Sequence, residues 1–553
     1  MESINGLVEP VRWLSEGSLK PPAIASFTLL VAFLVFTTQR RTPPSLFDPF
    51  PLFFNTVQFI FYNARFMTRV SKALNKSSIV GFRLFTTPVY IVSGPEDIQA
   101  IFSRSHSIGS EDIFEKNVFP VLYGMTKDEA RRFAEDKTGR RRQPAPGTEH
   151  VPIERRYWFG YDHVHSEYLG RPQHLRPIAD AYYKRLSQSL DKWYALDKWT
   201  TVSVTEFCRH QVAECAIVAL FGPRILELSP ELIDAFWEFD SNIFALTVAL
   251  PRWLTPKAYR AQDRYYGMIR TYVDAARKNF DWNGPAAEAG WEPEFGARVT
   301  RELVKWLKEA GFRDEVATGA LGMLLFALNS NAVPTTMWMI IRIVEDPSLL
   351  QAIREEVTTA YVTDAKTGSS TLDLDKLVAL PLLQSVFTEV LRLYMNFNLI
   401  RFVHEPVTMQ GFTLSRGCML QAPMSIHHRD GAVWDRKGHS ASEFWAERHI
   451  KHIEETDETG RITRKRVFAA AARPSSYYPF GGGHEMCPGR RFSKYEIFTT
   501  VALLVLKFDL EVIGWVKPDG TPSDRPARPD DRYSGVGAMP PDRDLTIRWK
   551  RTS

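Results

Sequence analysis

Cysteine is scarce in this chain. Only four cysteines occur among 553 residues, at positions 208, 215, 418 and 487, and no two of them form a C-x-x-C pair. This scarcity excludes a disulfide framework and a thiolate zinc cluster, and it favours a reducing compartment. Isolated cysteines are mostly buried and inert, so a special role for any one of them needs support from its neighbours.

A strong excess of either charge is also missing. Lys and Arg total 69 against 64 Asp and Glu, which gives a net charge of +5, and this is too small to predict a nucleic-acid partner. No Ser/Gly-rich linker, low-complexity stretch or internal repeat divides the chain. With 44% apolar and 12% aromatic residues the sequence is globular, and we expect one large domain.

The clearest run without charge lies near the N-terminus. Its 17 residues, 22–38, read PAIASFTLLVAFLVFTT, and Arg40 and Arg41 follow. This length is the lower limit for spanning a bilayer, which the thin membrane of the endoplasmic reticulum tolerates. A cleaved signal peptide is the alternative, but the preceding residues lack a basic bias and no A-x-A-like site follows. We therefore expect a single-pass transmembrane anchor in residues 1–41, with a main domain at 42–553 that the positive-inside rule keeps on the cytoplasmic side.

The main domain is predicted to be mainly α with small β-sheets. Residues 79–92 read as two strands around a turn, and Ser93 with Glu96 predicts a capping box that starts the next helix. Beyond residue 175 most apolar residues recur at helical spacing, and residues 545–551 alternate as a closing strand.

The structure of two segments can be interpreted in more than one way. Residues 51–70, PLFFNTVQFIFYNARFMTRV, predict an aromatic-rich helix that either touches lipid or packs into the core, and we expect core packing. Residues 127–142, KDEARRFAEDKTGRRR, are dense in charge and lead into two prolines. We predict an exposed loop there.

The segment at 480–498, FGGGHEMCPGRRFSKYEIF, gives Cys487 an unusual setting. Three glycines precede it, and glycine lets the backbone approach a bulky planar ligand. An apolar helix pattern follows to Leu506, so Cys487 lies just before a helix N-terminus, where free N–H groups and the helix dipole stabilise a thiolate. Such a thiolate suits an iron ligand, whereas an inert cysteine in a glycine-rich turn is the alternative.

This segment resembles the haem-binding loop of cytochromes P450. The family pattern Phe-x-x-Gly-x-Arg-x-Cys-x-Gly is matched by Phe480, Gly483, Cys487 and Gly489. The resemblance implies the P450 fold of the microsomal type, a haem cofactor, and Cys487 as the axial ligand of the iron. Glu485 stands where the family usually places an Arg or His that pairs with a haem propionate, and the neighbouring His484 is a candidate substitute.

Other segments carry the same resemblance in the same order. Pro381 opens a helix on which Glu389 and Arg392 are surface neighbours, although an isolated pair of this kind usually contributes little. In the family such an E-x-x-R pair forms a buried network with a later Arg, which Arg448 matches here. Arg401 lies where family members often carry a basic residue to the haem propionate.

The long apolar stretch from Ala317 to Pro347 is interrupted by polar residues and Pro334. Proline cannot donate a hydrogen bond to the carbonyl four residues back, so the helix should open beside Asn331. The family usually has an acid and a threonine here, which deliver protons to oxygen, but this chain has Ser330 and Asn331. The replacement is similar to the branch with the steroid 7α- and 12α-hydroxylases and prostacyclin synthase. Thr335, four residues after Asn331, could restore the relay.

The resemblance implies a monooxygenase that uses O₂ to oxidise a lipophilic steroid, terpenoid or other secondary metabolite. The sequence has no flavin or nicotinamide motif, so the electrons would come from a separate NADPH-cytochrome P450 reductase. A haem-thiolate isomerase that needs no reductase is the first alternative, because the branch named above contains one. A haem-binding membrane protein without enzymatic activity is the second.

Overall fold

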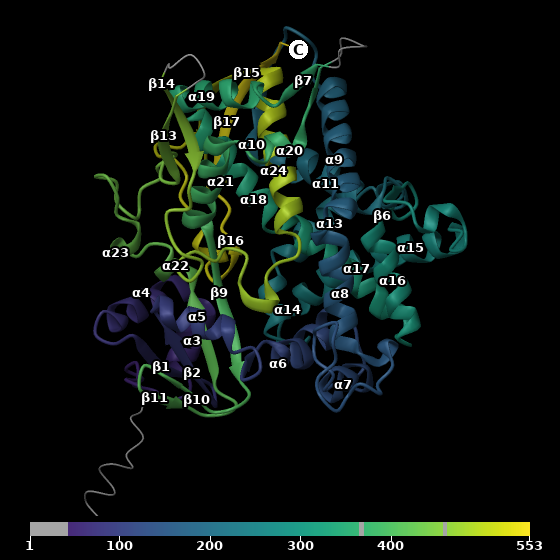
Figure 1. Cartoon of the computed structure of the whole chain (residues 1–553), viewed down its shortest axis with the longest axis vertical. Helices are drawn as coiled ribbons and strands as arrows, with labels where there is room; N and C mark the ends of the chain where they lie inside the picture. Colours follow the sequence, from purple (N-terminus) through teal and green to yellow (C-terminus); the bar gives the residue numbers. More distant parts are fainter. Residues whose placement is uncertain (1–42, 364–369, 457–461, 553) are drawn as a thin grey trace, which may run out of the picture.

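The computed structural model describes residues 43–363, 370–456 and 462–552, so the predicted transmembrane anchor lies outside the described residues. Figure 1 shows two regions of different character. Strands and short helices from the first part of the chain gather at the lower left, and long helices fill the right and the centre. The predicted class, mainly α with small sheets, is confirmed.

The largest sheet joins segments that are far apart in the sequence. Its order is β1-β2-β12-β9-β16, with β3 paired to β9. The hairpin predicted at residues 79–92 forms β1 and β2, and the predicted C-terminal strand is β17, which pairs with both β15 and β4. The strands are β1 Ile79–Leu84, β2 Thr87–Val92, β3 Ile108–Gly109, β4 Trp199–Ser203, β5 Trp291–Glu292, β6 Gly296–Ala297, β7 Tyr361–Thr363, β8 Ser370–Leu372, β9 Met395–Val403, β10 Val407–Met409, β11 Phe412–Leu414, β12 Met419–Pro423, β13 Ile450–Thr456, β14 Ile462–Phe468, β15 Phe508–Val516, β16 Val536–Ala538 and β17 Asp544–Arg551.

Helices build the rest of the domain. The first half contains α3 Phe54–Phe61, α4 Asn63–Leu74, α5 Pro95–Ser103, α6 Glu111–Ile113, α7 Lys127–Glu135, α8 Tyr157–Gly170, α9 Pro172–Trp193, α10 Val204–Glu206, α11 Ala213–Phe221, α12 Arg224–Leu228, α13 Leu232–Asp240, α14 Ile243–Thr247 and α15 Pro256–Asn279. The second half contains α16 Arg298–Glu309, α17 Asp314–Asn329, α18 Ala332–Val344, α19 Pro347–Thr358, α20 Leu374–Leu377, α21 Pro381–Tyr394, α22 Met424–His427, α23 Gly431–Trp434 and α24 Arg490–Lys507. Two π-helical turns, η1 Phe114–Leu122 and η3 Phe207–Val212, and the 3₁₀ turns η2 Ile153–Arg155, η4 Pro285–Ala287, η5 Gly483–Glu485 and η6 Asp531–Tyr533 complete the chain.

The central helix is broken where the sequence predicted. α17 ends at Asn329 and α18 begins at Ala332, with Ser330 and Asn331 between them. Together α17 and α18 are the one stretch in the described part of the chain that is long and apolar enough to cross a membrane, but most of it is buried in the core. Ala327 is an exception, because it is exposed in the middle of this buried helix.

Two local predictions were wrong. α5 begins at Pro95 with Gly94 as its N-cap and without a side-chain cap, so Ser93 and Glu96 form no capping box there. Residues 127–135 form α7 rather than a loop, because Thr126 and Glu129 make a capping box and the apolar side of the helix carries the buried Ala130 and Phe133. Charge density concealed this amphipathic pattern.

The aromatic segment at 51–70 is buried on one side and exposed on the other, so core packing describes only part of it. It forms α3 and α4, and Phe59 and Phe66 pack into a small core beneath β1 and β2. Its outer side is not covered: six large apolar side chains around α3 are exposed, namely Phe47, Phe50, Phe53, Val57, Phe61 and Tyr62. We call these six residues the aromatic patch. Core packing therefore describes only the inner face of this segment.

Candidate functional site

Cys487 lies in a tight loop that leads directly into α24. The Cys487 backbone N–H donates to the Phe480 carbonyl at 2.9 Å. Gly483 has φ +67°, and a Cβ there would lie 2.7 Å from the Phe102 carbonyl oxygen, so a side chain would fit neither the conformation nor the space. Gly489, the N-cap of α24, is less constrained, because its Cβ would meet only the Cys487 Sγ, at 3.9 Å.

The four cysteines differ in accessibility. Cys208, Cys215 and Cys418 are buried, and only Cys487 is exposed. Desolvation nevertheless raises the pKa of the Cys487 thiol, while the backbone N–H groups of Gly489 and Arg490 lower it. Cys487 is therefore accessible although its surroundings desolvate the thiol. Cys487 precedes a helix N-terminus as predicted, and the N–H groups of that terminus favour a sulfur anion.

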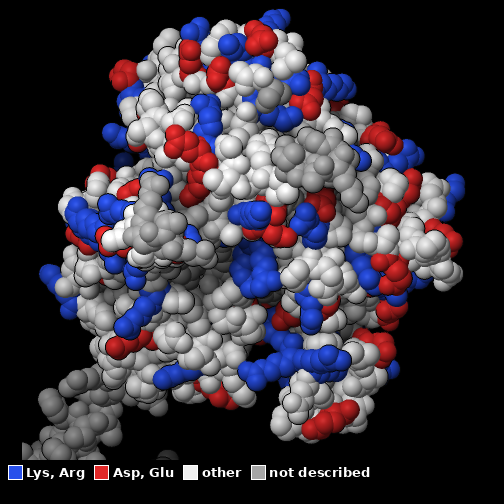
Figure 2. All heavy atoms as spheres, turned by 45° about the horizontal axis from the view of Figure 1, so that its top comes forward, with Lys and Arg blue, Asp and Glu red and all other residues white. Residues whose placement is uncertain are grey.

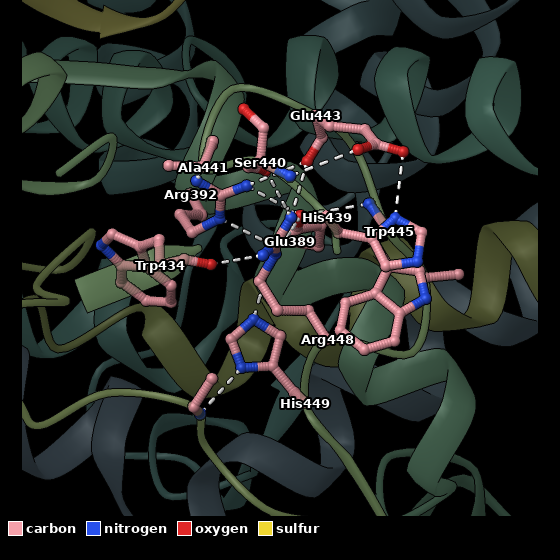
Figure 3. A network of polar contacts seen from close by, with 12 residues as sticks. Glu389, Arg392, Trp434, His439, Ser440, Ala441, Glu443, Trp445, Arg448 and His449 are labelled. Atoms are coloured by element: carbon pink, nitrogen blue, oxygen red, sulfur yellow. Dashed lines mark hydrogen bonds and ion pairs between the residues drawn. The ribbon is translucent and has the colours of Figure 1, made fainter. Parts of the chain in front are cut away.

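Behind this loop lies the predicted buried triad, drawn in Figure 3. Arg392 holds both Glu389 carboxylate oxygens, at 2.7 and 2.8 Å, and Arg448 Nε donates to Glu389 Oε1 at 2.8 Å. All three side chains are fully buried. Although burial opposes ionisation, the hydrogen bonds from Arg392, His449 and Arg448 lower the pKa of Glu389 to about 2. Because both guanidinium groups also donate to backbone carbonyls, the network ties α21 to the segment before α24.

Glu485, the departure from the family pattern, is the centre of a second charged cluster. Arg401 Nη2 lies 2.6 Å from Glu485 Oε2, and the Ser110 hydroxyl donates to Glu485 Oε1 at 2.7 Å. His484 Nε2 lies 3.5 Å from the same oxygen. His484 and Arg401 then hold the pKa of Glu485 well below its ordinary value against the opposing effect of burial. Arg401 is therefore directed to Glu485, and the carboxylate is ionised.

Arg140 joins this cluster and was missed by sequence reasoning, which placed it in an exposed loop. Its guanidinium is mostly buried over the Trp158 ring at 4.0 Å and binds Asp162 through two contacts of 2.9 and 3.0 Å. Arg140 Nε donates to Glu111 at 3.0 Å, and Nη2 lies 4.0 Å from Glu485. Within the described residues this Nη2 is buried and has no hydrogen-bond partner. It remains available to a further acceptor.

The break in the central helix is held by Asn331. The backbone N–H of Ala538 donates to Asn331 Oδ1 at 2.9 Å, and a Cβ on Gly537 would lie 2.5 Å from that oxygen. The C-terminal strand β16 therefore fixes the amide and leaves its NH₂ group for other contacts. The Thr335 hydroxyl donates to the Asn331 carbonyl at 2.7 Å. Its proton is thus committed to the backbone, and only its oxygen can receive one.

Ser330, the other residue of the break, lies close to a buried acid. Asp240, at the end of α13, is 5% exposed. Burial raises the pKa of Asp240 to about 6, against the lowering effects of Ser330 and Arg209. No local pattern pointed to Asp240, which precedes Ser330 by ninety positions.

Fold and cysteine loop together define a haem-thiolate protein, and comparison with known proteins agrees. The cytochrome P450 family model matches residues 184–528, and the chain belongs to this family, whose fold binds haem through a cysteine thiolate. It is 42% identical to the cytochrome P450 monooxygenase calL of Penicillium decumbens over 93% of both chains. It is 26% identical to the 25-hydroxycholesterol 7-alpha-hydroxylase of Rattus norvegicus, over 65% of this chain and 81% of that one.

A solved structure supports the fold alone. The retinoic acid-bound cyanobacterial CYP120A1 superposes with a TM-score of 0.63 over 92% of this chain and 99% of that one, at 18% identity. The protein is thus an enzyme, a cytochrome P450 monooxygenase by its relatives.

Proposed function

We propose that this enzyme uses O₂ and electrons from an NADPH-cytochrome P450 reductase to oxidise a lipophilic small molecule, a steroid, terpenoid or other secondary metabolite. The observation that carries the proposal is the pairing of an accessible Cys487 before α24 with a central helix that opens at Ser330 and Asn331. The names of the relatives, fungal monooxygenases and a sterol 7-alpha-hydroxylase, support this class of substrate.

Cys487 is the proposed axial ligand of the haem iron. The haem supplies oxygen activation, and thiolate ligation favours cleavage of the O–O bond. Phe480, Gly483 and Gly489 shape the loop beside it. The residues present fit the cofactor, because the thiol is accessible and backbone N–H groups favour its anion.

Haem propionates are anionic and need cations, which the Glu485 cluster supplies. Arg401, His484 and Arg140 converge on Glu485. Arg140 supports this assignment best, since its buried Nη2 lacks a partner among the described residues. Glu485 then positions Arg401 and Arg140 rather than binding a propionate itself.

At the helix break, Asn331 is proposed to orient a water or a substrate oxygen. Its Oδ1 is held by Ala538, so the NH₂ group is the free end and can only donate. Thr335 can contribute its hydroxyl oxygen as an acceptor. Because neither side chain is an acid, proton delivery requires another group.

Membrane attachment is proposed through residues 22–38, with the catalytic domain on the cytoplasmic face of the endoplasmic reticulum. The aromatic patch supports it, because six large apolar side chains are exposed within twenty residues of the point where the described chain begins. Deleting residues 1–41 should weaken membrane attachment and leave haem binding intact. If the truncated protein stayed wholly membrane-bound in high salt and carbonate, the aromatic patch would be the main anchor.

The surface suits an acidic partner protein. Figure 2 shows that acidic and basic residues are intermingled over much of this face, while Lys and Arg gather toward its centre. Exposed Arg473 and Arg491 flank the cysteine segment in sequence. Such basic residues steer an electron donor of opposite charge and make its association dependent on salt.

An isomerase is the second candidate, because the break carries Asn331 instead of an acid–threonine pair and the Thr335 proton is already committed. The deciding experiment compares metabolites in host cells with and without the active protein. The purified enzyme is then incubated with the responding metabolite, reductase, O₂ and NADPH. Product that requires both NADPH and reductase supports the monooxygenase, and turnover that persists without reductant would exclude it.

A further inference from the structure

The cysteine loop places a carboxylate next to the proposed iron ligand. Glu485 precedes Cys487 by two positions, so their Cα atoms lie at most about 7 Å apart. The loop between them is held in place, because the Cys487 backbone N–H donates to the Phe480 carbonyl at 2.9 Å. Glu485 ends the 3₁₀ turn η5, and its side chain is only 12% exposed. The carboxylate therefore has a fixed place relative to the cysteine.

The contacts of Glu485 hold it as an anion. Arg401 Nη2, from β9, lies 2.6 Å from Glu485 Oε2. Ser110 donates twice to Oε1, from its hydroxyl at 2.7 Å and from its backbone N–H at 3.3 Å. The His484 ring lies 3.5 Å from Oε1 and carries a charge only when it is protonated. Ion pairs and charge-assisted hydrogen bonds of this length stabilise the ionised carboxylate.

The guanidinium groups around Glu485 are shared with other acids. Arg140 Nη1 contacts both Asp162 oxygens, at 2.9 and 3.0 Å, and Arg140 Nε donates to Glu111 at 3.0 Å. Its Nη2 reaches Glu485 only at 4.0 Å. Three carboxylates therefore share the guanidinium groups of Arg140 and Arg401. A site that served only to neutralise an anionic cofactor would instead carry more cations than acids.

A buried negative charge near an iron centre disfavours the addition of an electron. The reduction Fe³⁺ + e⁻ → Fe²⁺ adds one negative charge, which a neighbouring carboxylate repels. For one unit charge about 10 Å away at an effective dielectric constant of about 20, the Coulomb energy changes the ratio of ferrous to ferric iron about tenfold. Because Glu485 is buried, dissolved ions screen this effect only slightly.

We propose that Glu485 lowers the reduction potential of the bound haem and so limits electron entry from the reductase, an inference that rests on the proposed haem ligation by Cys487. At a given potential of the reductase, fewer haem irons are then ferrous. The unproductive reaction O₂ + 2e⁻ + 2H⁺ → H₂O₂ is therefore slower when no substrate is bound. Glu485 acts through its charge and does not touch the reacting atoms.

Variants of the full-length holoprotein separate charge from shape. Glu485→Gln removes the charge at nearly constant shape, and Glu485→Asp keeps the charge. Arg401→Gln removes the partner cation instead. Glu511→Gln is the control, because Glu511 is 49% exposed in its pair with Arg548 and solvent screens its charge. Each variant is first checked for haem content and for the Soret band of thiolate ligation.

Anaerobic spectroelectrochemical titration measures the ratio of ferrous to ferric haem at the wild-type midpoint potential. We expect this ratio to rise about tenfold in Glu485→Gln, which is about 59 mV for one electron. It should fall about tenfold in Arg401→Gln and change less than about twofold in Glu485→Asp and Glu511→Gln. The rise should persist in high salt. With reductase and without substrate, Glu485→Gln should also form peroxide from NADPH faster than wild type.

Two results would overturn this role of Glu485. One is a ratio that changes less than about twofold in Glu485→Gln, and the other is an equal rise in Glu485→Asp, which would show a distorted loop rather than a lost charge. If Glu485→Gln binds no haem, Ser110→Ala decides. It keeps the carboxylate but removes the donor at 2.7 Å, so the ratio should fall about threefold, and an unchanged or raised ratio would overturn the role as well.

Failure of the proposed function is seen in the wild type instead. A wild-type carbonyl complex without the Soret band of thiolate ligation would remove Cys487 as the ligand. Absence of O₂ consumption by wild type with NADPH, reductase and the responding metabolite would remove the oxygenase function. Neither result depends on the charge at Glu485.

Discussion

Two buried carboxylates, Glu389 and Asp240, have pKa values shifted in opposite directions. Glu389 receives hydrogen bonds from Arg392 and Arg448 that hold its pKa at about 2, whereas Asp240 has only Ser330 and the more distant Arg209, and its pKa rises to about 6. Both are nearly inaccessible. Burial alone therefore does not decide the charge of an acid, and the number of committed donors does.

The comparison separates an acid with a full set of donors from one without. Glu389 is saturated, so it fixes the segment before the cysteine loop and has no proton to give. Asp240 is unsaturated, so it can bind and release a proton near neutral pH, at a cost in stability.

The largest effect is expected from Arg392→Leu. It leaves the Glu389 charge buried with half of its donors gone, which typically costs about 3–5 kcal/mol. We expect no folded holoprotein, measured as haem per polypeptide. The control is Arg548→Leu, which breaks the half-exposed pair with Glu511 and should cost about 1 kcal/mol or less. Full haem occupancy in Arg392→Leu would show that the triad is dispensable.

The pH dependence of stability should differ in sign between the two acids. The folded pKa of Asp240 is raised from 3.8 to about 6, so the folded state binds more protons and loses about 3 kcal/mol as pH rises through that window. Glu389 is lowered from 4.5 to about 2, so its contribution is complete above pH 4.5 and disappears as pH falls toward 2.

Thermal unfolding of wild type and Asp240→Asn between pH 4 and 7 measures the first effect. The variant should be the more stable of the two at pH 7, with the difference vanishing near pH 4. Equal stability at both pH values would mean that Asp240 is fully compensated in the folded protein.

Cys487→Ala should abolish the spectrum of thiolate ligation without unfolding the protein, because Cys487 contacts neither Glu389 nor Asp240. The reduced carbonyl complex of wild type is expected to show the red-shifted Soret band of thiolate ligation, and the variant should lack it while keeping its far-UV circular dichroism. A normal band in the variant would exclude Cys487 as the ligand.

The smallest structural effect is expected at the helix break. Asn331→Ala and Thr335→Val should each retain substrate binding, seen as an unchanged spectral titration, while more of the NADPH consumed yields peroxide instead of product. An unchanged ratio of product to NADPH in both variants would show that neither side chain takes part in proton delivery.

Local patterns in the sequence determined much of this molecule. The apolar stripe that begins at Pro381 predicted α21, the glycines before Cys487 predicted a tight loop ahead of a helix, and Pro334 predicted the break in the central helix. In each case the residues that decide the conformation lie within one or two helical turns of each other, so their spacing along the chain carries the information.

Only the tertiary structure decided which charges meet. Arg401 and Arg140 reach Glu485 from distant segments. The charged segment that contains Arg140 read as exposed because density of charge predicts solvation, yet three carboxylates surround its guanidinium. Such pairings depend on how helices pack rather than on local periodicity, and a buried charge is tolerated only where that packing supplies its partner.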